Sequence, residues 1–275
     1  MFLLLQLSLL GPCPLSNMNT SLNCDTNTVT VSWTPGRGIF TYNVNANAFN
    51  IVDQQTCSTN GSSCNVTSLT CGESYQVSVS GLGKTCSSPA QTWNRVNAAP
   101  CPPTQVRVDF SCSSNNITVS WMASKGSVSY MAVADNGKDQ LWTCNTSSTA
   151  CQVSNLPCGQ DYKVYVVGID DKCTGAKSNI TKIQTAPCVP GNIQPNLDCL
   201  SGVLNVTWQS TGNFSQFYTS VVSSTGQVST CTSNNQYCIV RNLQCEMTYS
   251  VTVMAQSKAC NSSLSPINKV TAGNS

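Results

Sequence analysis

Cysteine is the residue type in this chain whose number and spacing could do chemistry. The 275 residues include 18 cysteines and no histidine. Cysteines can form disulfides, bind zinc as thiolates, or act as nucleophiles beside a base. They fall in three sets of six, and the set recurs after 87 or 88 residues. The sets are Cys13, Cys24, Cys57, Cys64, Cys71 and Cys86, then Cys101, Cys112, Cys144, Cys151, Cys158 and Cys173, then Cys188, Cys199, Cys231, Cys238, Cys245 and Cys260.

The spacing favours disulfides over the other two chemistries. Structural zinc sites prefer two cysteines separated by two to four residues, whereas here six residues separate Cys57 from Cys64 and Cys64 from Cys71. Even sets leave no odd thiol, and the chain has no histidine to activate a nucleophile. Disulfide frameworks persist in oxidising compartments, so we expect an extracellular or secreted protein. We expect no enzymatic activity, no metal site and no cofactor.

Charged side chains are few and evenly mixed. The chain has 13 basic and 11 acidic residues, a net charge of +2, and charged residues make up 9% of it. Such a chain has no field to attract nucleic acid or an anionic membrane, so we expect an extracellular protein or matrix component as partner. The adjacent pair Asp170 and Asp171 is typical of a solvated loop, with weak calcium binding as the alternative.

Nine asparagines stand in Asn-x-Ser/Thr sequons, which predict a glycoprotein once the chain is secreted. The apolar run "MFLLLQLSLL" is too short to span a bilayer and resembles the apolar part of a signal peptide, so residues 1–11 are expected to be a short or truncated signal segment. The sequons are at Asn19, Asn60, Asn65, Asn116, Asn145, Asn179, Asn205, Asn213 and Asn261.

The elements that must position the cysteines are β-strands. Apolar and polar residues alternate in "TVTVSW" (28–33), "YNVNANAF" (42–49), "CNVTSL" (64–69) and "YQVSVSGL" (75–82). This period of two indicates half-buried strands, and no stretch has a helical period. About seven strands in each unit predict an all-β fold of antiparallel sandwiches.

Recurring aromatic residues then resemble those of a known family. Each unit has a Trp on its second strand and a Leu followed six residues later by a Tyr, and this pattern resembles the fibronectin type III domain. The resemblance implies three tandem Ig-like seven-stranded β-sandwiches, of a cysteine-rich kind, at residues 12–98, 99–185 and 186–275. In such a fold the Trp is core and the Tyr hydroxyl bonds the backbone at a corner. The residues are Trp33, Trp121, Trp208, Tyr75, Tyr162 and Tyr249.

Strand geometry limits how six cysteines in one unit can pair. Each strand carries the chain about 23 Å to the opposite end of the sandwich, whereas bridged Cα atoms lie within about 7 Å. Cys24 and Cys71 are the only two cysteines at their end of the sandwich, so we expect them to pair. The stretch "CSTNGSSC" predicts a hairpin that brings Cys57 and Cys64 together. Cys13 is then left to pair with Cys86. The same reasoning predicts three disulfides inside every unit. The further pairs are Cys101–Cys173, Cys112–Cys158, Cys144–Cys151, Cys188–Cys260, Cys199–Cys245 and Cys231–Cys238.

The remaining aromatic and basic residues are the candidates for binding. Trp93 and Trp142 do not recur between units, and neither do Arg37 and Arg95, so the fold does not require them. The alternative is that they pack on edge strands.

Linkers are nearly absent, which predicts a semi-rigid rod of three beads. We expect an adhesion or matrix scaffold; the alternatives are a secreted effector or inhibitor that acts through one unit's loops, and a fragment of a receptor ectodomain.

Overall fold

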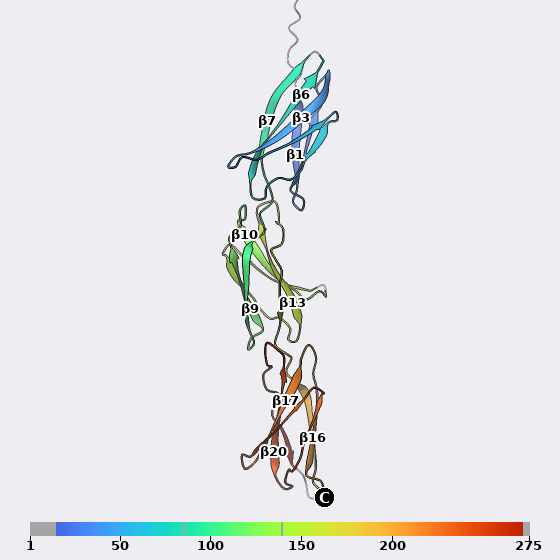
Figure 1. The fold of residues 1–275 in the computed structure, drawn as a ribbon, viewed down its shortest axis with the longest axis vertical. Coiled ribbons are helices and arrows are strands. Elements are labelled where there is room, and N and C mark those ends of the chain that lie inside the picture. The colour runs from blue at the N-terminus through green and yellow to red at the C-terminus, as the bar shows by residue number, and fades with distance from the viewer. Residues whose placement is uncertain (1–14, 85, 139, 272–275) are drawn as a thin grey trace, which may run out of the picture.

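The structure is a computed structural model that describes residues 15–84, 86–138 and 140–271, without the side chains of residues 93 and 94. The chain forms three β-sandwiches stacked end to end into a narrow rod (Figure 1). Every strand pairing among the described residues is antiparallel, and no helix occurs there. Accordingly, no described helix could cross a membrane. The predicted all-β sandwiches are confirmed.

Each sandwich, called repeat 1, 2 or 3 below, faces a three-stranded sheet with a four-stranded one. The sheet orders in repeat 1 are β1-β2-β5 and β4-β3-β6-β7, and the other repeats have equivalent orders. Repeat 1 comprises β1 (Ser16–Asn23), β2 (Thr28–Thr34), β3 (Ile39–Ala48), β4 (Gln54–Thr59), β5 (Ser63–Val66), β6 (Ser74–Gly83) and β7 (Ser87–Asn97). Repeat 2 comprises β8 (Thr104–Ser111), β9 (Asn116–Met122), β10 (Ser129–Asp135), β11 (Leu141–Thr146), β12 (Ala150–Val153), β13 (Asp161–Ile169) and β14 (Thr181–Gln184). Repeat 3 comprises β15 (Gly191–Asp198), β16 (Val203–Gln209), β17 (Gln216–Ser223), β18 (Val228–Ser233), β19 (Tyr237–Val240), β20 (Thr248–Gln256) and β21 (Asn268–Thr271).

The alternating strands bury one face each, and the recurrent tryptophans lie at the centre of the three cores. Trp33 packs against Tyr42 with ring centroids 5.1 Å apart, and Trp208 packs against Phe217 at the same distance. Trp121 is buried in the same way beside Tyr130. Because these large rings remove the most apolar area from water, they account for the recurrence of Trp at this position.

The tyrosine corner forms in two repeats and fails in the third. The Tyr75 hydroxyl accepts a hydrogen bond from the backbone N–H of Thr70 at 2.8 Å, and the Tyr249 hydroxyl accepts one from Gln244 at 2.8 Å. Tyr162 is equally buried, but its hydroxyl has no partner among the described residues. Proline 157 occupies the donor position five residues earlier and has no N–H to give. The expected backbone bond is therefore wrong for Tyr162.

The predicted hairpin around "CSTNGSSC" is also wrong. Cys57 lies on β4 and Cys64 on β5, and these strands belong to different sheets. Their disulfide, with Cα atoms 6.3 Å apart, therefore joins the two sheets across the edge of the sandwich. Cys144–Cys151 and Cys231–Cys238 do the same in the other repeats, so the predicted pairing is right although its reason is not.

Candidate functional site at the junctions between repeats

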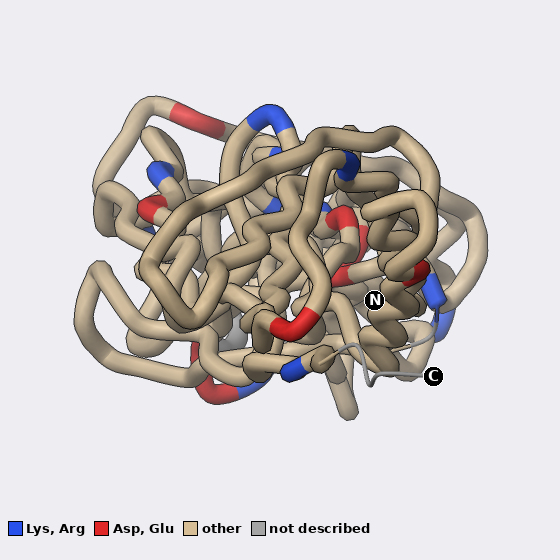
Figure 2. Tube along the Cα trace, turned by 90° about the horizontal axis from the view of Figure 1, so that it is seen from below, with Lys and Arg blue, Asp and Glu red and all other residues tan. Residues whose placement is uncertain are grey.

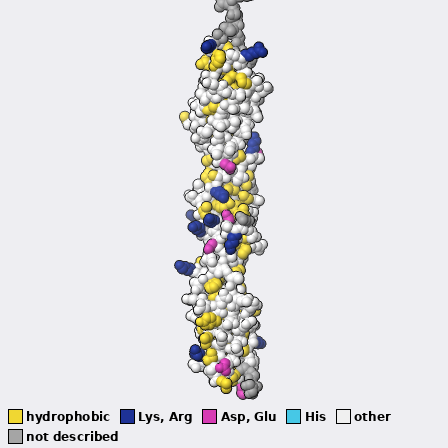
Figure 3. Space-filling model, turned by 90° about the vertical axis from the view of Figure 1, so that its right-hand side faces the viewer, with side chains coloured by type: hydrophobic (Ala, Val, Ile, Leu, Met, Phe, Trp, Pro, Cys, Tyr) yellow, Lys and Arg dark blue, Asp and Glu magenta, His cyan; other side chains and the backbone are white. Residues whose placement is uncertain are grey.

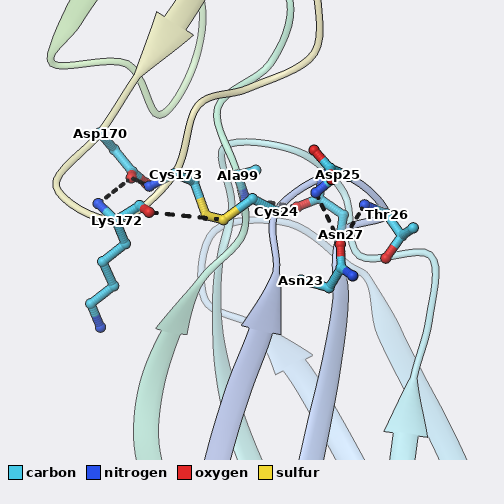
Figure 4. Close-up of a disulfide and its surroundings, with 9 residues drawn as sticks. All are labelled: Asn23, Cys24, Asp25, Thr26, Asn27, Ala99, Asp170, Lys172 and Cys173. Carbon is cyan, nitrogen blue, oxygen red and sulfur yellow. Dashed lines mark hydrogen bonds between the residues drawn. A yellow bond between two sulfur atoms is a disulfide. The ribbon is translucent and has the colours of Figure 1, made fainter.

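The junction between repeats 1 and 2 is closed by two disulfides. Cys24, in the turn after β1, bonds Cys173, in the loop between β13 and β14, with Cα atoms 5.5 Å apart and a sequence separation of 149 (Figure 4). Cys71, in the turn before β6, bonds Cys101 at the start of repeat 2, with a Cα separation of 4.9 Å. Two bridges that leave different turns oppose both bending and twisting at this joint.

The junction between repeats 2 and 3 repeats this arrangement. Cys112 bonds Cys260 across 148 residues with Cα atoms 5.6 Å apart, and Cys158 bonds Cys188 with Cα atoms 4.9 Å apart. The nearly equal Cα separations and sequence separations show that the two junctions have the same disulfide arrangement.

These bridges show that four of the predicted pairs are wrong, because the prediction assumed that cysteines pair only within their own unit. Cys24 and Cys71 do lie at the same end of repeat 1, but the next repeat brings two further cysteines to that end. The wrong pairs are Cys24–Cys71, Cys101–Cys173, Cys112–Cys158 and Cys188–Cys260. The structure has Cys199–Cys245 as predicted, within repeat 3. Cys13, the expected partner of Cys86, lies outside the described residues, and Cys86 is disulfide-bonded.

A carboxylate shapes the loop that presents Cys173. The Asp170 side-chain oxygen Oδ1 accepts hydrogen bonds from the backbone N–H groups of Lys172 at 2.8 Å and Cys173 at 2.6 Å (Figure 4). In repeat 3 the Ser257 hydroxyl accepts from the N–H of Cys260 at 3.1 Å. Asp170 therefore holds the backbone that aims Cys173 at Cys24. Among the described residues, no group of three or more His, Cys, Asp or Glu side chains could hold a metal ion.

An asparagine in each of the first two repeats ties down the linker. Asn27 has a left-handed backbone with φ of 47°, and its side-chain oxygen accepts a hydrogen bond from the Ala99 N–H at 2.7 Å. Asn115, with φ of 50°, accepts from Ala186 at 3.1 Å. Asparagine tolerates this backbone better than most residues and supplies an acceptor as well. The linker is thus bonded to the preceding sandwich before it enters the next one.

Glycine permits the close approach of the two backbones. Gly72 has φ of +67°, and a Cβ there would lie 2.5 Å from the carbonyl oxygen of Lys125 in repeat 2. Gly159 has φ of +61°, and its Cβ would lie 2.9 Å from the Cα of Gly212 in repeat 3. At the second joint a backbone hydrogen bond crosses between the repeats in the space so gained, from the N–H of Asn213 to the carbonyl oxygen of Gly159 at 2.9 Å. A side chain at either glycine would separate the repeats.

Polar side chains add one specific contact to each joint. Lys125 of repeat 2 forms an ion pair with Glu73 of repeat 1, whose side chain is 2% exposed against 51% for the lysine. At the second joint the Asn213 amide donates to the Asp161 carboxylate at 2.9 Å. A buried carboxylate without a cation is energetically costly, so Lys125 compensates the buried charge of Glu73 in the first joint.

The two tryptophans proposed as binding anchors lie in different repeats. Trp142 lies on the edge strand β11, is half-buried, and packs edge-on against Tyr162 with ring centroids 5.3 Å apart. It therefore follows the alternative of packing on an edge strand. Trp93 lies in β7, but its side chain is outside the described part. Of the arginines, Arg95 lies over the ring of Phe49 at 5.3 Å and Arg37 is exposed.

The sequons and the charges are spread over the length of the rod. Eight of the nine sequon asparagines are exposed, whereas Asn116 is partly buried and its side-chain oxygen accepts from the Asn155 N–H at 3.1 Å. Viewed along the axis, acidic and basic residues are scattered around the circumference (Figure 2). In the perpendicular view, several Lys and Arg side chains gather beside repeat 2, with acidic side chains among them (Figure 3). A mixed surface of this kind favours specific protein contacts over a single-sign partner.

Comparison with known proteins agrees with this architecture. Residues 101–184, which contain β8 to β14, match the family model of the fibronectin type III domain. The chain carries fibronectin type III domains. It is 30% identical over 240 residues to the mouse (Mus musculus) protein named fibronectin type III domain-containing protein 7, which covers 86% of this chain and 31% of that protein. The human (Homo sapiens) protein of the same name is 30% identical over 205 residues, 74% of this chain and 27% of that one. The chain thus spans less than a third of these curated relatives.

Solved fibronectin type III segments are more distant. The crystal structure of chicken CNTN1 FN1-FN3 domains is 16% identical, with a TM-score of 0.31, and the match covers 94% of this chain and 99% of that one. A segment of two fibronectin type III domains from chicken tenascin is 15% identical, with a TM-score of 0.41, over 62% of this chain and 99% of that one. In this chain, disulfides hold fibronectin type III domains together in series, and sequence reasoning missed this feature. The signal for it was the linker, in which Cys101 follows the last residue of β7 by only four positions.

Proposed function

We propose that the chain is a non-enzymatic extracellular glycoprotein that acts as a stiff spacer and protein-binding scaffold. The observation that supports this most is the double disulfide at each joint, since it removes the hinge that tandem domains normally have between them. Disulfides of this number persist where the surroundings are oxidising, which supports secretion. The exposed sequons support glycans along the sides of the rod.

The joints also indicate where a partner would bind. At both ends of repeat 2, turns are occupied by the neighbouring repeats through Cys101, Cys173, Cys112 and Cys158. A partner that grips end loops, as an antibody combining site does, would have to compete with these contacts. The sheet faces and edge strands along the sides remain accessible. A stiff rod then holds side-facing sites at constant separation, which favours the scaffold over an effector that uses one repeat's loops.

Small-angle X-ray scattering on the chain secreted from mammalian cells tests this proposal. We expect the oxidised protein to have the maximum dimension and the narrow profile of the straight rod, and full reduction to broaden both. Mass spectrometry of the same material should show occupied sequons. An oxidised sample that scatters as three freely jointed beads would contradict the spacer function, and retention of the chain inside the cell would contradict secretion.

The binding role is tested with the same material. Extracellular proteins captured by the intact rod are compared with those captured by a variant in which Cys24, Cys71, Cys101 and Cys173 are all Ser, which frees the first joint while keeping the sandwich sides. A partner retained only by the intact rod supports a scaffold with sites at fixed spacing. Equal capture by both proteins would indicate that one repeat suffices, as for an effector.

A further inference from the structure

One end of repeat 3 corresponds to the joint-forming ends of repeats 1 and 2. It keeps their two cysteines but has a different residue at the other two positions that form the joint. This end, called the distal end below, consists of the turn after the first strand and the turn before the sixth strand. In repeats 1 and 2 the turns supply a bridging Cys and an Asn, then a second bridging Cys and a Gly. The sets are Cys24, Asn27, Cys71 and Gly72, then Cys112, Asn115, Cys158 and Gly159, and in repeat 3 Cys199, Gly202, Cys245 and Glu246.

The two cysteines of this end bond each other in repeat 3. Cys199 and Cys245 form a disulfide with Cα atoms 5.4 Å apart, whereas the cysteines in the same places of repeats 1 and 2 bond the next repeat. The same turns therefore support either pairing. In repeats 1 and 2 the partners of these cysteines belong to the repeat that follows, so the residues around the cysteines, and not the bond itself, must distinguish the ends.

Gly202 keeps the backbone of Asn27 but not its bond to a linker. Its φ is +64°, and its carbonyl oxygen accepts from the Leu243 N–H at 3.0 Å, as that of Asn27 accepts from Leu69 at 3.4 Å. Without a side chain, Gly202 has no oxygen to accept the linker N–H that Asn27 accepts from Ala99. One of the contacts that place the following linker is thus missing.

Glu246 puts a side chain where the next repeat would have to lie. Its φ is 65°, the same left-handed backbone as at Gly72 and Gly159, although it is not a glycine. At those glycines a Cβ would lie 2.5 Å and 2.9 Å from the backbone of the next repeat. A Cβ in contact at less than 3.0 Å requires one of the two backbones to move. Glu246 therefore prevents a joint of the kind seen at Gly72 and Gly159.

The residues that follow repeat 3 also differ from the linker that follows repeat 1. Val96 pairs with Tyr75 in the last sheet of repeat 1, and Val270 pairs with Tyr249 in repeat 3. The fifth residue after Val96 is Cys101, which bonds Cys71, whereas the fifth residue after Val270 is Ser275. Serine cannot form the bridge to Cys245.

From the differences at Gly202, Glu246 and Ser275 we propose that the distal end of repeat 3 is a closed end, which does not form a joint of the kind seen after repeats 1 and 2. The Cys199–Cys245 bond replaces two forward bridges, and Glu246 excludes the turn that would carry them. Any repeat attached beyond residue 271 is joined by a flexible linkage and not by a clamp. The inference concerns the reach of the stiff segment and does not depend on which partner the rod binds.

Transplanting the closed end into the first joint tests the proposal in the native chain. The variant carries Asn27→Gly and Gly72→Glu, and peptide mapping without reduction identifies the bridges. We expect Cys24–Cys71 and Cys101–Cys173 to replace Cys24–Cys173 and Cys71–Cys101; two S–S bonds join four sulfurs in both arrangements, so no net oxidation is involved. The second joint of the same molecules, with Cys112–Cys260 and Cys158–Cys188, serves as the internal control.

A matched variant separates the contact from backbone strain. Gly137 also has positive φ, of +72°, but nothing lies within 4 Å of a Cβ there, so Gly137→Glu carries the strain without the obstruction. We expect this control to keep the native bridges at both joints. If the transplanted variant keeps Cys24–Cys173 in the same yield as the second joint keeps its bridges, the proposal is wrong.

The reverse experiment opens the closed end. Residues 98–184, which contain a linker and repeat 2, are attached directly after Thr271, in register because Thr271 pairs in the sheet as Asn97 does. In this fusion we expect Cys199–Cys245 to persist and scattering to show a flexible last repeat. With Gly202→Asn and Glu246→Gly added, we expect Cys199 and Cys245 to bond the attached repeat. Forward bridges in the unaltered fusion would overturn the closed end, and their absence from the altered fusion would show that Gly202 and Glu246 do not determine the pairing.

Discussion

Removing the long bridge of the first joint should separate the unfolding of repeats 1 and 2. The change is Cys24→Ser together with Cys173→Ser, which leaves Cys71–Cys101 in place. With that second bridge intact, the loop that Cys24–Cys173 closes contains about 119 residues, running from 24 to 71 and from 101 to 173. The chain-entropy relation then gives at most about 5 kcal/mol of stabilisation at 25 °C.

The expected size of the effect follows from the two coupled repeats. For a folding unit of 150 to 250 residues, 1 kcal/mol corresponds to about 2–4 °C in Tm, so the upper limit for the variant is a loss of about 10–20 °C. Differential scanning calorimetry of the oxidised proteins measures it. We expect one shared transition for the two repeats in the native chain and two resolved transitions in the variant, with a bent profile in small-angle scattering.

Cys57→Ser with Cys64→Ser is the matched control. It removes a bridge inside repeat 1 that spans 7 residues, worth about 2.4 kcal/mol by the same relation. Repeat 1 should lose stability while the rod stays straight. If the first variant keeps a single transition at the native temperature and a straight profile, the joint is held by its non-covalent contacts and the reasoning from the disulfide is wrong.

Four further predictions concern single side chains. Tyr162→Phe should leave the free energy of unfolding unchanged within about 0.5 kcal/mol, whereas Tyr249→Phe should lower it by about 1–2 kcal/mol in urea titrations, because only Tyr249 loses hydrogen bonds. Burial raises the pKa of Tyr162 to about 12, so the folded state holds that proton while the unfolded state loses it near pH 10, and stability should fall as pH rises between these values. Burial also raises the pKa of Tyr75, so absorbance at 295 nm should show late titration from both tyrosines, and Tyr162→Phe should remove the contribution of Tyr162 alone. The Tyr75 hydroxyl bond holds the pKa of Asp53 below its ordinary value, so this carboxylate stabilises the fold above about pH 3.8 and the contribution is lost in stronger acid; Tyr75→Phe should raise that pKa in NMR titrations, and an unchanged value would contradict the assigned cause. Lys125→Ala should destabilise the first joint by about 1–3 kcal/mol by thermal unfolding, because Glu73 is left buried without its cation, and Glu73→Gln in the same chain should restore part of the loss.

Much of each repeat could be predicted from local pattern. Apolar and polar residues alternate in stretches such as residues 28–33 and 75–82, because a half-buried sheet imposes a period of two. This alternation predicted strands at the positions where β2 and β6 lie. Trp33 and its counterparts were assigned to the core because they recur. The missing hydroxyl bond of Tyr162 was visible in principle, since Pro157 stands at the donor position and lacks an N–H.

The joints could not be predicted by treating one repeat at a time. Elimination placed Cys24 and Cys71 at one end of the sandwich correctly, but it could not show how far the next repeat would intrude. That distance depends on the contact between Gly72 and Lys125, which is long-range and leaves no periodic pattern. The absence of a spacer between Asn97 and Cys101 was the available hint, because so short a linker keeps consecutive sandwiches within bonding distance.

The long span of Cys24–Cys173 sets an order of events during synthesis. Cys71, which can pair with Cys24 as Cys245 does with Cys199, leaves the ribosome about 102 residues before Cys173. At about 5–20 residues per second, Cys24 waits about 5–20 s for its native partner while a nearer thiol is within reach. The nascent chain must therefore either keep these thiols reduced or exchange an early bond later. The yield of straight rods should accordingly depend on the supply of disulfide isomerase during translation.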